Sequence, residues 1–517
     1  MMAKTKNKYG QYFTSASIAE YMVTLITHDV SAKVLEPSCG EGVFLGMLEK
    51  HGFGNITAYE IDPTLDNPYE YVDYRSFVSS PEDENFDVII GNPPYIRWRN
   101  LEEHLKAELA QSRLWSLYFN SMCDYFFIFI LKSIEQLNDA GELIFICPEY
   151  WMNTTHSESL RDYMVAHGSL TDIYHFKEVP LFEGVASSFV IFRYVKSVAV
   201  ASMNVWRYAG KKRPTTEGLQ KASSFVLTTV PQFEPGERWI FATSEERLSM
   251  ISFERSCRKR CLPVASSGDY YRIGDFCDIG NGMVSGLDKA FRIEDVSLLN
   301  ERERDALIHV YKAKDLRCFR NVSDSYYFFV KEDIDEETFA NRYPNVYSRL
   351  IPYRDELSKR YSYGKELKMW EFAFPRNEAL FRRPEYRIFV PCKERISNKN
   401  HFRFAIADPE TFPLQDVTGI LKKSNCRESI YYLLAYLNSS RVFEWLKHNG
   451  VVKGEVVEFS ESPVASIPYR PIVWENAREV ELHDRIVQAT QQYVRTADAA
   501  LLPIIEKNLE KLFYEQD

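Results

Sequence analysis

The sequence predicts an α/β protein with a doubly wound, mostly parallel sheet, followed by a second unit of different character. Three observations lead to this prediction. Short apolar runs alternate with helical spacings from residue 34 to residue 195, which is typical of a parallel sheet covered by helices. A polar stretch at 209–224 then interrupts the pattern, and glycine turns punctuate the chain beyond it. The 517 residues suit about two to four domains at roughly 150 residues each.

Composition narrows the class of protein. Hydrophobic residues make up 45% and charged residues 26%, as in soluble globular proteins. The formal net charge of -10 means that any positive field for nucleic acid has to be local. Apolar runs near the start fall short of the roughly 18 residues of a membrane helix, and the nine cysteines form no zinc pattern. We therefore expect a cytoplasmic protein with reduced thiols, no metal and no membrane span.

The first predicted element is a helix over residues 18–26, preceded by a glycine-aromatic loop at 8–15. Apolar residues in the helix recur at helical spacing, and hydroxyl side chains before it can serve as N-caps. The loop, which contains Tyr12 and Thr14, can cover a ligand. An ordinary capped first helix is the alternative.

A short strand at 33–36 then leads into a Gly-x-Gly turn and a helix. Gly40 and Gly42 allow the backbone to approach a ligand closely. Leu45 stands where a dinucleotide fingerprint has its third glycine, and no Gly-Lys-Ser/Thr is present. The pattern therefore excludes a dinucleotide fingerprint and a P-loop.

Acidic residues stand at the ends of the next two predicted strands. Glu60 follows the strand that starts at Thr57, where a carboxylate can accept from both hydroxyls of a ribose. Asp73 ends a third strand, and we expect it to accept from an adenine amino group while Tyr74 lies against the ring. Together with the glycine turn, these acids predict a nucleoside site.

The stretch at 86–95 contains the residues that we predict to contact the reacting group. Its apolar run, Val88–Ile90, predicts a buried strand, and Pro93 and Pro94 then hold the chain in an extended turn. Asn92 is thereby placed at the carboxyl end of a strand, where its amide oxygen and the Pro93 carbonyl offer two acceptors to a planar NH₂ group. Tyr95 adds a ring that can stack on a base. A strand followed by a proline turn is the alternative.

The remaining elements continue the alternation. The sequence predicts a loop and helix rich in Arg, Trp and Glu at 97–123, an apolar helix at 124–137, a strand at 142–148, a helix at 160–165, and strands at 170–176 and 188–193.

The second half is separated by a predicted linker at 209–238, between a first domain at 1–208 and a second at 239–517. Cationic residues cluster at 255–260 and at 382–399, the latter interleaved with aromatic residues. On an acidic protein such clusters suit contacts with phosphates, although a solvated surface of mixed charge explains them equally well. The chain ends in predicted amphipathic helices.

These motifs resemble, in order, those of the gamma-class DNA N6-adenine methyltransferases of restriction–modification systems. The likeness runs over nearly the whole chain and is carried by the loop at 8–14, the turn at 36–44 and Asn92-Pro93-Pro94-Tyr95. Ser15 replaces the proline that usually follows the threonine of that loop. The resemblance implies a seven-stranded Rossmann-like methyltransferase sheet in residues 1–208. It also implies a separate α+β target-recognition domain with C-terminal helices in residues 239–517.

The resemblance also implies the ligands and the site. It implies S-adenosylmethionine as methyl donor, double-stranded DNA as substrate with a flipped-out adenine, a cognate restriction endonuclease as partner, and a monomer. The implied catalytic residues are Asn92, Pro93, Pro94, Tyr95 and Phe182. The implied cofactor-binding residues are Tyr12, Thr14, Glu36, Pro37, Ser38, Gly40, Gly42, Glu60, Ile61, Asp73 and Tyr74.

Two alternatives stay open. Asn-Pro-Pro-Tyr also serves methyltransferases that modify protein glutamine or RNA, although those resemble this chain only around the catalytic strand. A catalytically silent DNA-binding subunit is the other alternative, and the presence of Glu36, Glu60, Asp73 and Asn92 argues against it.

Overall fold

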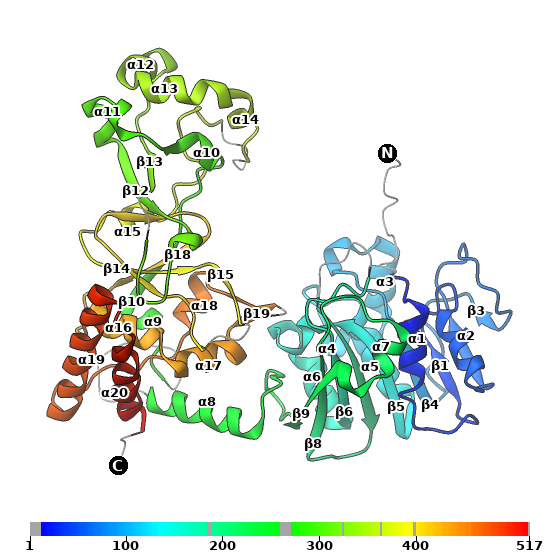
Figure 1. Cartoon of the computed structure of the whole chain (residues 1–517). Coiled ribbons are helices and arrows are strands. Elements are labelled where there is room, and N and C mark those ends of the chain that lie inside the picture. The colour runs from blue at the N-terminus through cyan, green and yellow to red at the C-terminus, as the bar shows by residue number, and fades with distance from the viewer. Residues whose placement is uncertain are drawn as a thin grey trace. The chain divides into compact units, whose positions relative to one another are not determined.

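The computed structural model describes residues 12–182, 188–258, 270–322, 325–361, 364, 366–396, 400–453 and 455–514. The loop residues predicted at 8–11 lie outside these ranges, as do residues 259–260 and 397–399 of the two cationic clusters. The chain divides into two compact units, Met1–Glu245 and Glu246–Asp517, which are considered separately (Figure 1). Among the described residues, no helix combines the length and apolarity that a membrane crossing requires.

The first unit is built on a sheet of nine strands in the order β3-β2-β1-β4-β5-β7-β6-β8-β9. The strands β1 to β5 pair in parallel, and β7 lies antiparallel between β5 and β6. The strands are β1 (Val34–Glu36), β2 (Ile56–Tyr59), β3 (Val72–Asp73), β4 (Phe86–Gly91), β5 (Leu137–Pro148), β6 (Gly168–His175), β7 (Phe189–Lys196), β8 (Ser202–Tyr208) and β9 (Phe225–Pro231).

The predicted count of seven strands is wrong, because β8 and β9 extend the sheet beyond the seven strands read from the sequence. Strand β8 pairs in parallel with β6, and β9 pairs antiparallel with β8. The linker predicted at 209–238 is therefore partly sheet, and the boundary between the units falls after Glu245. Strand β9 has an apolar sequence, but only Phe225 and Val230 are buried in it, so its residues show no regular core-facing pattern that would set it apart from the polar stretch before it.

Helices cover both faces of this sheet (Figure 1). The strand β4 shows why, since Ile89 belongs to one hydrophobic core while Val88 and Ile90 belong to the other. This alternation follows the two-residue period of a strand, and the apolar run predicted a buried strand for the same reason. One core includes α3 (Glu103–Gln111), α4 (Arg113–Tyr118), α5 (Phe126–Gln136) and α6 (Glu158–His167), and the other includes α1 (Ala16–Val23), α2 (Val43–Lys50) and α7 (Thr216–Gln220).

The second unit combines helices with smaller sheets. Its sheets have the orders β10-β18-β14-β16, β11-β13-β12-β17 and β15-β20-β19. The strands are β10 (Cys277–Asn281), β11 (Arg292–Ile293), β12 (Leu307–Tyr311), β13 (Ser325–Phe328), β14 (Arg387–Pro391), β15 (Lys393–Arg395), β16 (Ala405–Ala407), β17 (Thr411–Pro413), β18 (Val417–Lys422), β19 (Val451–Lys453) and β20 (Val456–Glu458).

The helices of the second unit include the long helices predicted at the end of the chain, α19 and α20, which pack on each other. The helices are α8 (Ser244–Ser256, which begins just before the boundary), α9 (Ile273–Phe276), α10 (Asp288–Phe291), α11 (Glu301–Asp305), α12 (Glu336–Arg342), α13 (Pro344–Leu350), α14 (Arg354–Ser358), α15 (Glu378–Phe381), α16 (Ile430–Leu437), α17 (Ser440–Asn449), α18 (Glu461–Ala465), α19 (Ala477–Thr496) and α20 (Leu502–Tyr514).

Candidate functional site

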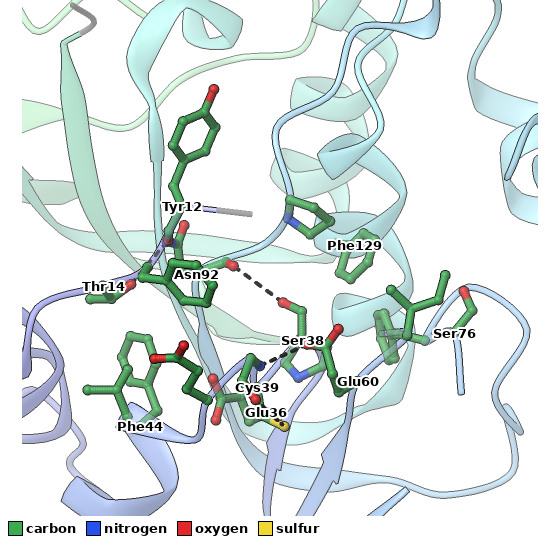
Figure 2. Close-up of a pocket in the computed structure, with 18 of the residues that line it drawn as sticks. Tyr12, Thr14, Glu36, Ser38, Cys39, Phe44, Glu60, Ser76, Asn92 and Phe129 are labelled. Atoms are coloured by element: carbon green, nitrogen blue, oxygen red, sulfur yellow. Dashed lines mark hydrogen bonds between the residues drawn. The ribbon is translucent and has the colours of Figure 1, made fainter. Parts of the chain in front are cut away.

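A cavity lies at the carboxyl ends of the neighbouring parallel strands β2, β1 and β4, with an empty volume of about 820 Å³, open solvent included (Figure 2). This is where open α/β sheets bind their ligands. Most of the residues predicted to bind a cofactor line it together with two residues of the predicted catalytic turn. They are Tyr12, Thr14, Glu36, Pro37, Ser38, Gly40, Glu60, Ile61, Asn92 and Pro94.

Glu60, just after β2, holds the glycine turn in place. One carboxylate oxygen accepts from the Gly40 N–H at 2.8 Å and the other accepts from the Asp62 N–H at 2.8 Å. The side chain is 3% exposed, and this burial raises its pKa, while the backbone donors act in the opposite direction. Each carboxylate oxygen still has a lone pair for a further donor. Glu60 is therefore both a support of the turn and an acceptor at the cavity wall.

Glu36 ends β1 and is buried against the cavity. Burial, and after it the charge of Glu60, raises the pKa of Glu36 well above its usual range. Its Oε2 atom has no hydrogen-bond partner among the described residues. A buried polar atom without a partner is costly, so this oxygen calls for a ligand that brings a hydrogen-bond donor or a positive charge.

The turn depends on Gly42, which precedes α2 with a φ of 81°. A Cβ atom at this position would lie 2.7 Å from the ring of Tyr69. Gly42 does not itself line the cavity, but the next residues, Val43 and Phe44, do. The residue thus fixes the direction in which α2 leaves the turn.

We expect Gly42→Ala to lower the free energy of unfolding by about 1–3 kcal/mol, because the added methyl group meets both a left-handed backbone and the Tyr69 ring. Thermal or urea denaturation measures the change. Gly54→Ala is the matched control, since a methyl group at that residue would have no atom within 4 Å and its φ is not in the left-handed region. If both substitutions change the free energy of unfolding by the same amount, the left-handed backbone and the Tyr69 ring do not restrict position 42.

The amide of Asn92, immediately after β4, is oriented by the loop before α1 (Figure 2). Its Nδ2 donates to the Tyr12 carbonyl at 2.7 Å and to Thr14 Oγ1 at 3.0 Å. The Oδ1 atom accepts from the Tyr95 hydroxyl. Because both acceptors of the NH₂ group come from the loop, a flip of the amide would break both bonds. The loop therefore determines which way the amide oxygen points.

Aromatic rings gather beside this amide. The rings of Tyr12 and Tyr95 stack with centroids 5.7 Å apart, and Phe182 lies 6.2 Å from Tyr12. Phe189, at the start of β7, lies 5.9 Å from Tyr95 and 4.7 Å from Phe182. Burial raises the pKa of the Tyr95 phenol well above its usual range, so this hydroxyl keeps its proton. The structure thus brings Phe182 into one cluster with Tyr95, from a distant part of the chain.

Asp73 and Tyr74 are not brought to the cavity. The Asp73 carboxylate pairs with Arg75 at 2.6 Å and its side chain is 44% exposed, and Tyr74 is also exposed. Ser76 and Phe77 line the cavity instead. Since β3 spans only two residues, the chain leaves the sheet after Asp73 and returns toward the cavity three residues later.

Besides Ser76 and Phe77, the sequence analysis missed other residues that line the cavity. Tyr125 and Phe129 reach the cavity from the start and the first turn of α5. They lie in a run of apolar residues that predicted a buried helix without indicating which side chains face a ligand. Only the packing of α5 against the segment after β3 distinguishes them.

Comparisons with known proteins agree on one group. A family model described as Eco57I restriction-modification methylase matches residues 48–182. The type II methyltransferase M.HindII of Haemophilus influenzae strain Rd is 44% identical over 511 residues, covering 98% of each chain. The type II methyltransferase M.HincII of Haemophilus influenzae is 41% identical over 509 residues, again covering 98% of each chain.

A solved structure shares the fold. The type IIL restriction-modification enzyme MmeI in complex with DNA aligns with a TM-score of 0.59 and 11% identity, covering 96% of this chain and 72% of that chain. At this identity the likeness concerns the fold alone.

Proposed function

Because this chain belongs to the type II methyltransferases of restriction–modification systems, and is therefore a DNA methyltransferase, we propose that it methylates N6 of an adenine flipped out of duplex DNA. The methyl donor in this proposal is S-adenosylmethionine. The observation that carries the proposal is the amide of Asn92, held at the edge of a cavity with its oxygen directed away from the loop.

The lining residues fit this cofactor. Glu60 suits the ribose hydroxyls, since its carboxylate retains acceptor capacity beside the glycine turn. The orphan Oε2 of Glu36 suits the α-ammonium group of the methionine part. Ser76 and Phe77 offer a hydroxyl and a ring to the adenine of the cofactor, in the role first expected of Asp73 and Tyr74. When bound, the cofactor supplies a methyl group activated by its sulfonium.

The chain's own contribution to the reaction is positioning. The Asn92 Oδ1 and the Pro93 carbonyl accept hydrogen bonds from the two N–H groups of the target adenine N6. These hydrogen bonds localise the lone pair on N6, so that N6 can attack the methyl group. Oδ1 can accept from N6 while it accepts from the Tyr95 hydroxyl, because an amide oxygen has two lone pairs. Holding the nucleophile in line with the methyl group is the main catalytic lever, and no covalent intermediate with the protein is required.

The aromatic cluster stabilises the extruded base. Flipping costs a few kcal/mol, and stacking on aromatic side chains returns roughly 1–3 kcal/mol per base. The Tyr12 and Tyr95 rings are only 5.7 Å apart, whereas an inserted base needs two contacts of about 3.5 Å each. A base that stacks on this face of Tyr95 therefore takes the place of the Tyr12 ring, while Phe182 borders the pocket.

We assign target recognition to the second unit, which combines helices and sheets in the manner expected of such a domain. The prediction that the cationic cluster at 382–399 contacts phosphates has to be limited to some of its residues. Arg387 is fully buried and donates only to backbone carbonyls, and Arg383 pairs with Asp278 and Glu385. Exposed residues of the same stretch, Lys393 and Arg395, are better suited to phosphate contacts.

The proposal extends to the cellular setting expected of a modification enzyme. We propose that the protein acts as a monomer on cytoplasmic DNA and that a cognate restriction endonuclease accompanies it.

Expression in a methylation-deficient host, followed by single-molecule sequencing of its DNA, tests the proposed reaction. We expect N6-methyladenine at one recurrent sequence. Transfer of tritiated methyl groups to duplex DNA, RNA and protein in parallel separates the alternatives that share the Asn-Pro-Pro-Tyr motif. Methylated cytosine, or label that enters RNA or protein rather than DNA, would contradict the proposal.

A further inference from the structure

One face of α5 packs along the segment that follows β3, residues 76–81. Four side chains spaced four, three and four residues apart form a single stripe along α5. They are Tyr125, Phe129, Lys132 and Gln136. Tyr125 lines the cavity together with Ser76. The other three, in order, make a ring contact to Phe77 at 5.3 Å, hydrogen bonds to Phe77, Val78 and Ser80, and a hydrogen bond to the Pro81 carbonyl at 2.8 Å.

Lys132 makes most of these contacts. Its Nζ donates to the carbonyls of Phe77, Val78 and Ser80 at 2.8, 3.1 and 2.6 Å. The hydroxyl of Ser80 lies at 3.1 Å from the same nitrogen, and the Phe77 ring centroid at 5.0 Å. The side chain is 1% exposed. A single ammonium group is thus hydrogen-bonded to three carbonyls of a segment that is neither helix nor strand.

This ammonium group is unusual because every one of these acceptors is neutral. Buried charges are normally paired, yet the carboxylates that act on Lys132, those of Glu82 and Glu108, do so only by longer-range charge interaction. Burial lowers the pKa of Lys132 to about 8. The ammonium group instead supplies a donor to the buried carbonyls of Val78 and Ser80, and a further donor to the Phe77 carbonyl, which also accepts from the N–H and the hydroxyl of Ser80.

The held segment is a wall of the cavity. Ser76 and Phe77 line the cavity, as do Tyr125 and Phe129 from the same stripe of α5, whereas Lys132 does not. We propose that Lys132 is a positioning residue for the cofactor, fixing Ser76 and Phe77 as the surface against which the adenosine of S-adenosylmethionine binds. This inference rests on the proposed function.

The test is the dissociation constant for S-adenosylmethionine of the full chain, measured by calorimetry, for wild type and Lys132→Met. We expect the constant to rise roughly 10- to 100-fold, the range for losing a hydrogen bond to a charged group. The turnover number at saturating cofactor should stay within about threefold, since Lys132 touches neither reactant. Lys50→Met, which removes an exposed lysine paired with Glu20, is the control and should bind as wild type does.

Measuring the same dissociation constant at several pH values distinguishes loss of the Lys132 charge from a mere loss of packing. The wild-type constant should rise between about pH 7 and 9 as Lys132, with its pKa of about 8, loses its proton, and it should rise more than that of Lys132→Met. The amino group of the ligand also titrates in this range, but it does so equally for both proteins, so the difference reports Lys132. Two milder variants, Lys132→Gln and Ser80→Ala, extend the test to the case in which Lys132→Met does not fold, and both should weaken binding.

The outcomes separate the two proposals. If wild type binds S-adenosylmethionine but the Lys132 and Ser80 variants bind equally well with an unchanged pH profile, the role of Lys132 is refuted and the proposed function stands. If wild type does not bind S-adenosylmethionine at all, the proposed cofactor is wrong and the inference about Lys132 falls with it.

Discussion

Asn92→Ala is expected to reduce methyl transfer at least about 10²–10³-fold, the loss typical of removing one positioned polar group from a transition state. The substitution removes the amide oxygen that, in the proposed mechanism, accepts from the target amino group. The cofactor's proposed contacts come from Glu36, Glu60 and the segment at 76–77, so its dissociation constant should stay within about threefold. Single-turnover transfer of tritiated methyl groups to duplex DNA, together with calorimetry, measures both quantities.

The Asn92 amide also anchors the loop before α1, and a control has to separate this from catalysis. Thr14→Val removes one of the two acceptors of the Asn92 NH₂ group while leaving the amide oxygen in place. We expect Thr14→Val to retain most of its turnover, because the Tyr12 carbonyl still holds the amide. Turnover of Asn92→Ala within tenfold of wild type, or an equal loss in Thr14→Val, would contradict the catalytic role of the amide oxygen.

Glu60→Ala is expected to raise the dissociation constant for S-adenosylmethionine roughly 100-fold or more. The substitution removes the acceptor of the Gly40 and Asp62 N–H groups, which orient the glycine turn, and it also removes the proposed acceptor of the ribose hydroxyls. Hydrogen bonds to a charged group contribute about 1.5–3 kcal/mol each, so losing one or two of them accounts for this factor. Calorimetric titration of the variant with the cofactor measures it.

Asp73→Ala is the matched comparison, because the sequence first suggested that both carboxylates bind the nucleoside. The Asp73 side chain is half exposed and paired with Arg75, and surface ion pairs contribute little. We expect its removal to change the dissociation constant by less than about threefold. If Asp73→Ala weakens binding as much as Glu60→Ala does, the original assignment of Asp73 is correct and the one based on Ser76 and Phe77 is wrong.

The sequence alone was sufficient to place residues at the cavity where they end or directly follow the central strands β1, β2 and β4. Glu36, Glu60 and Asn92 each follow an apolar run, and parallel strands bring their carboxyl ends to one edge of the sheet. The strand β4 could be recognised because its apolar side chains face two cores, which gives an uninterrupted run rather than an alternation. These features depend on a few neighbouring residues, so a local pattern determines them.

Only the tertiary structure decided which residues after β3 face the cavity, that β9 belongs to the sheet, and that Lys132 is buried. The sequence indicated Asp73, whereas the packing of α5 against the segment at 76–81 brings Phe77 to the cavity instead. Likewise, Arg387 reads as a surface cation until its backbone acceptors are seen. The physical reason is common to all of these cases. Burial and direction of a side chain outside regular structure are set by contacts with segments distant in sequence, and no local pattern encodes those contacts.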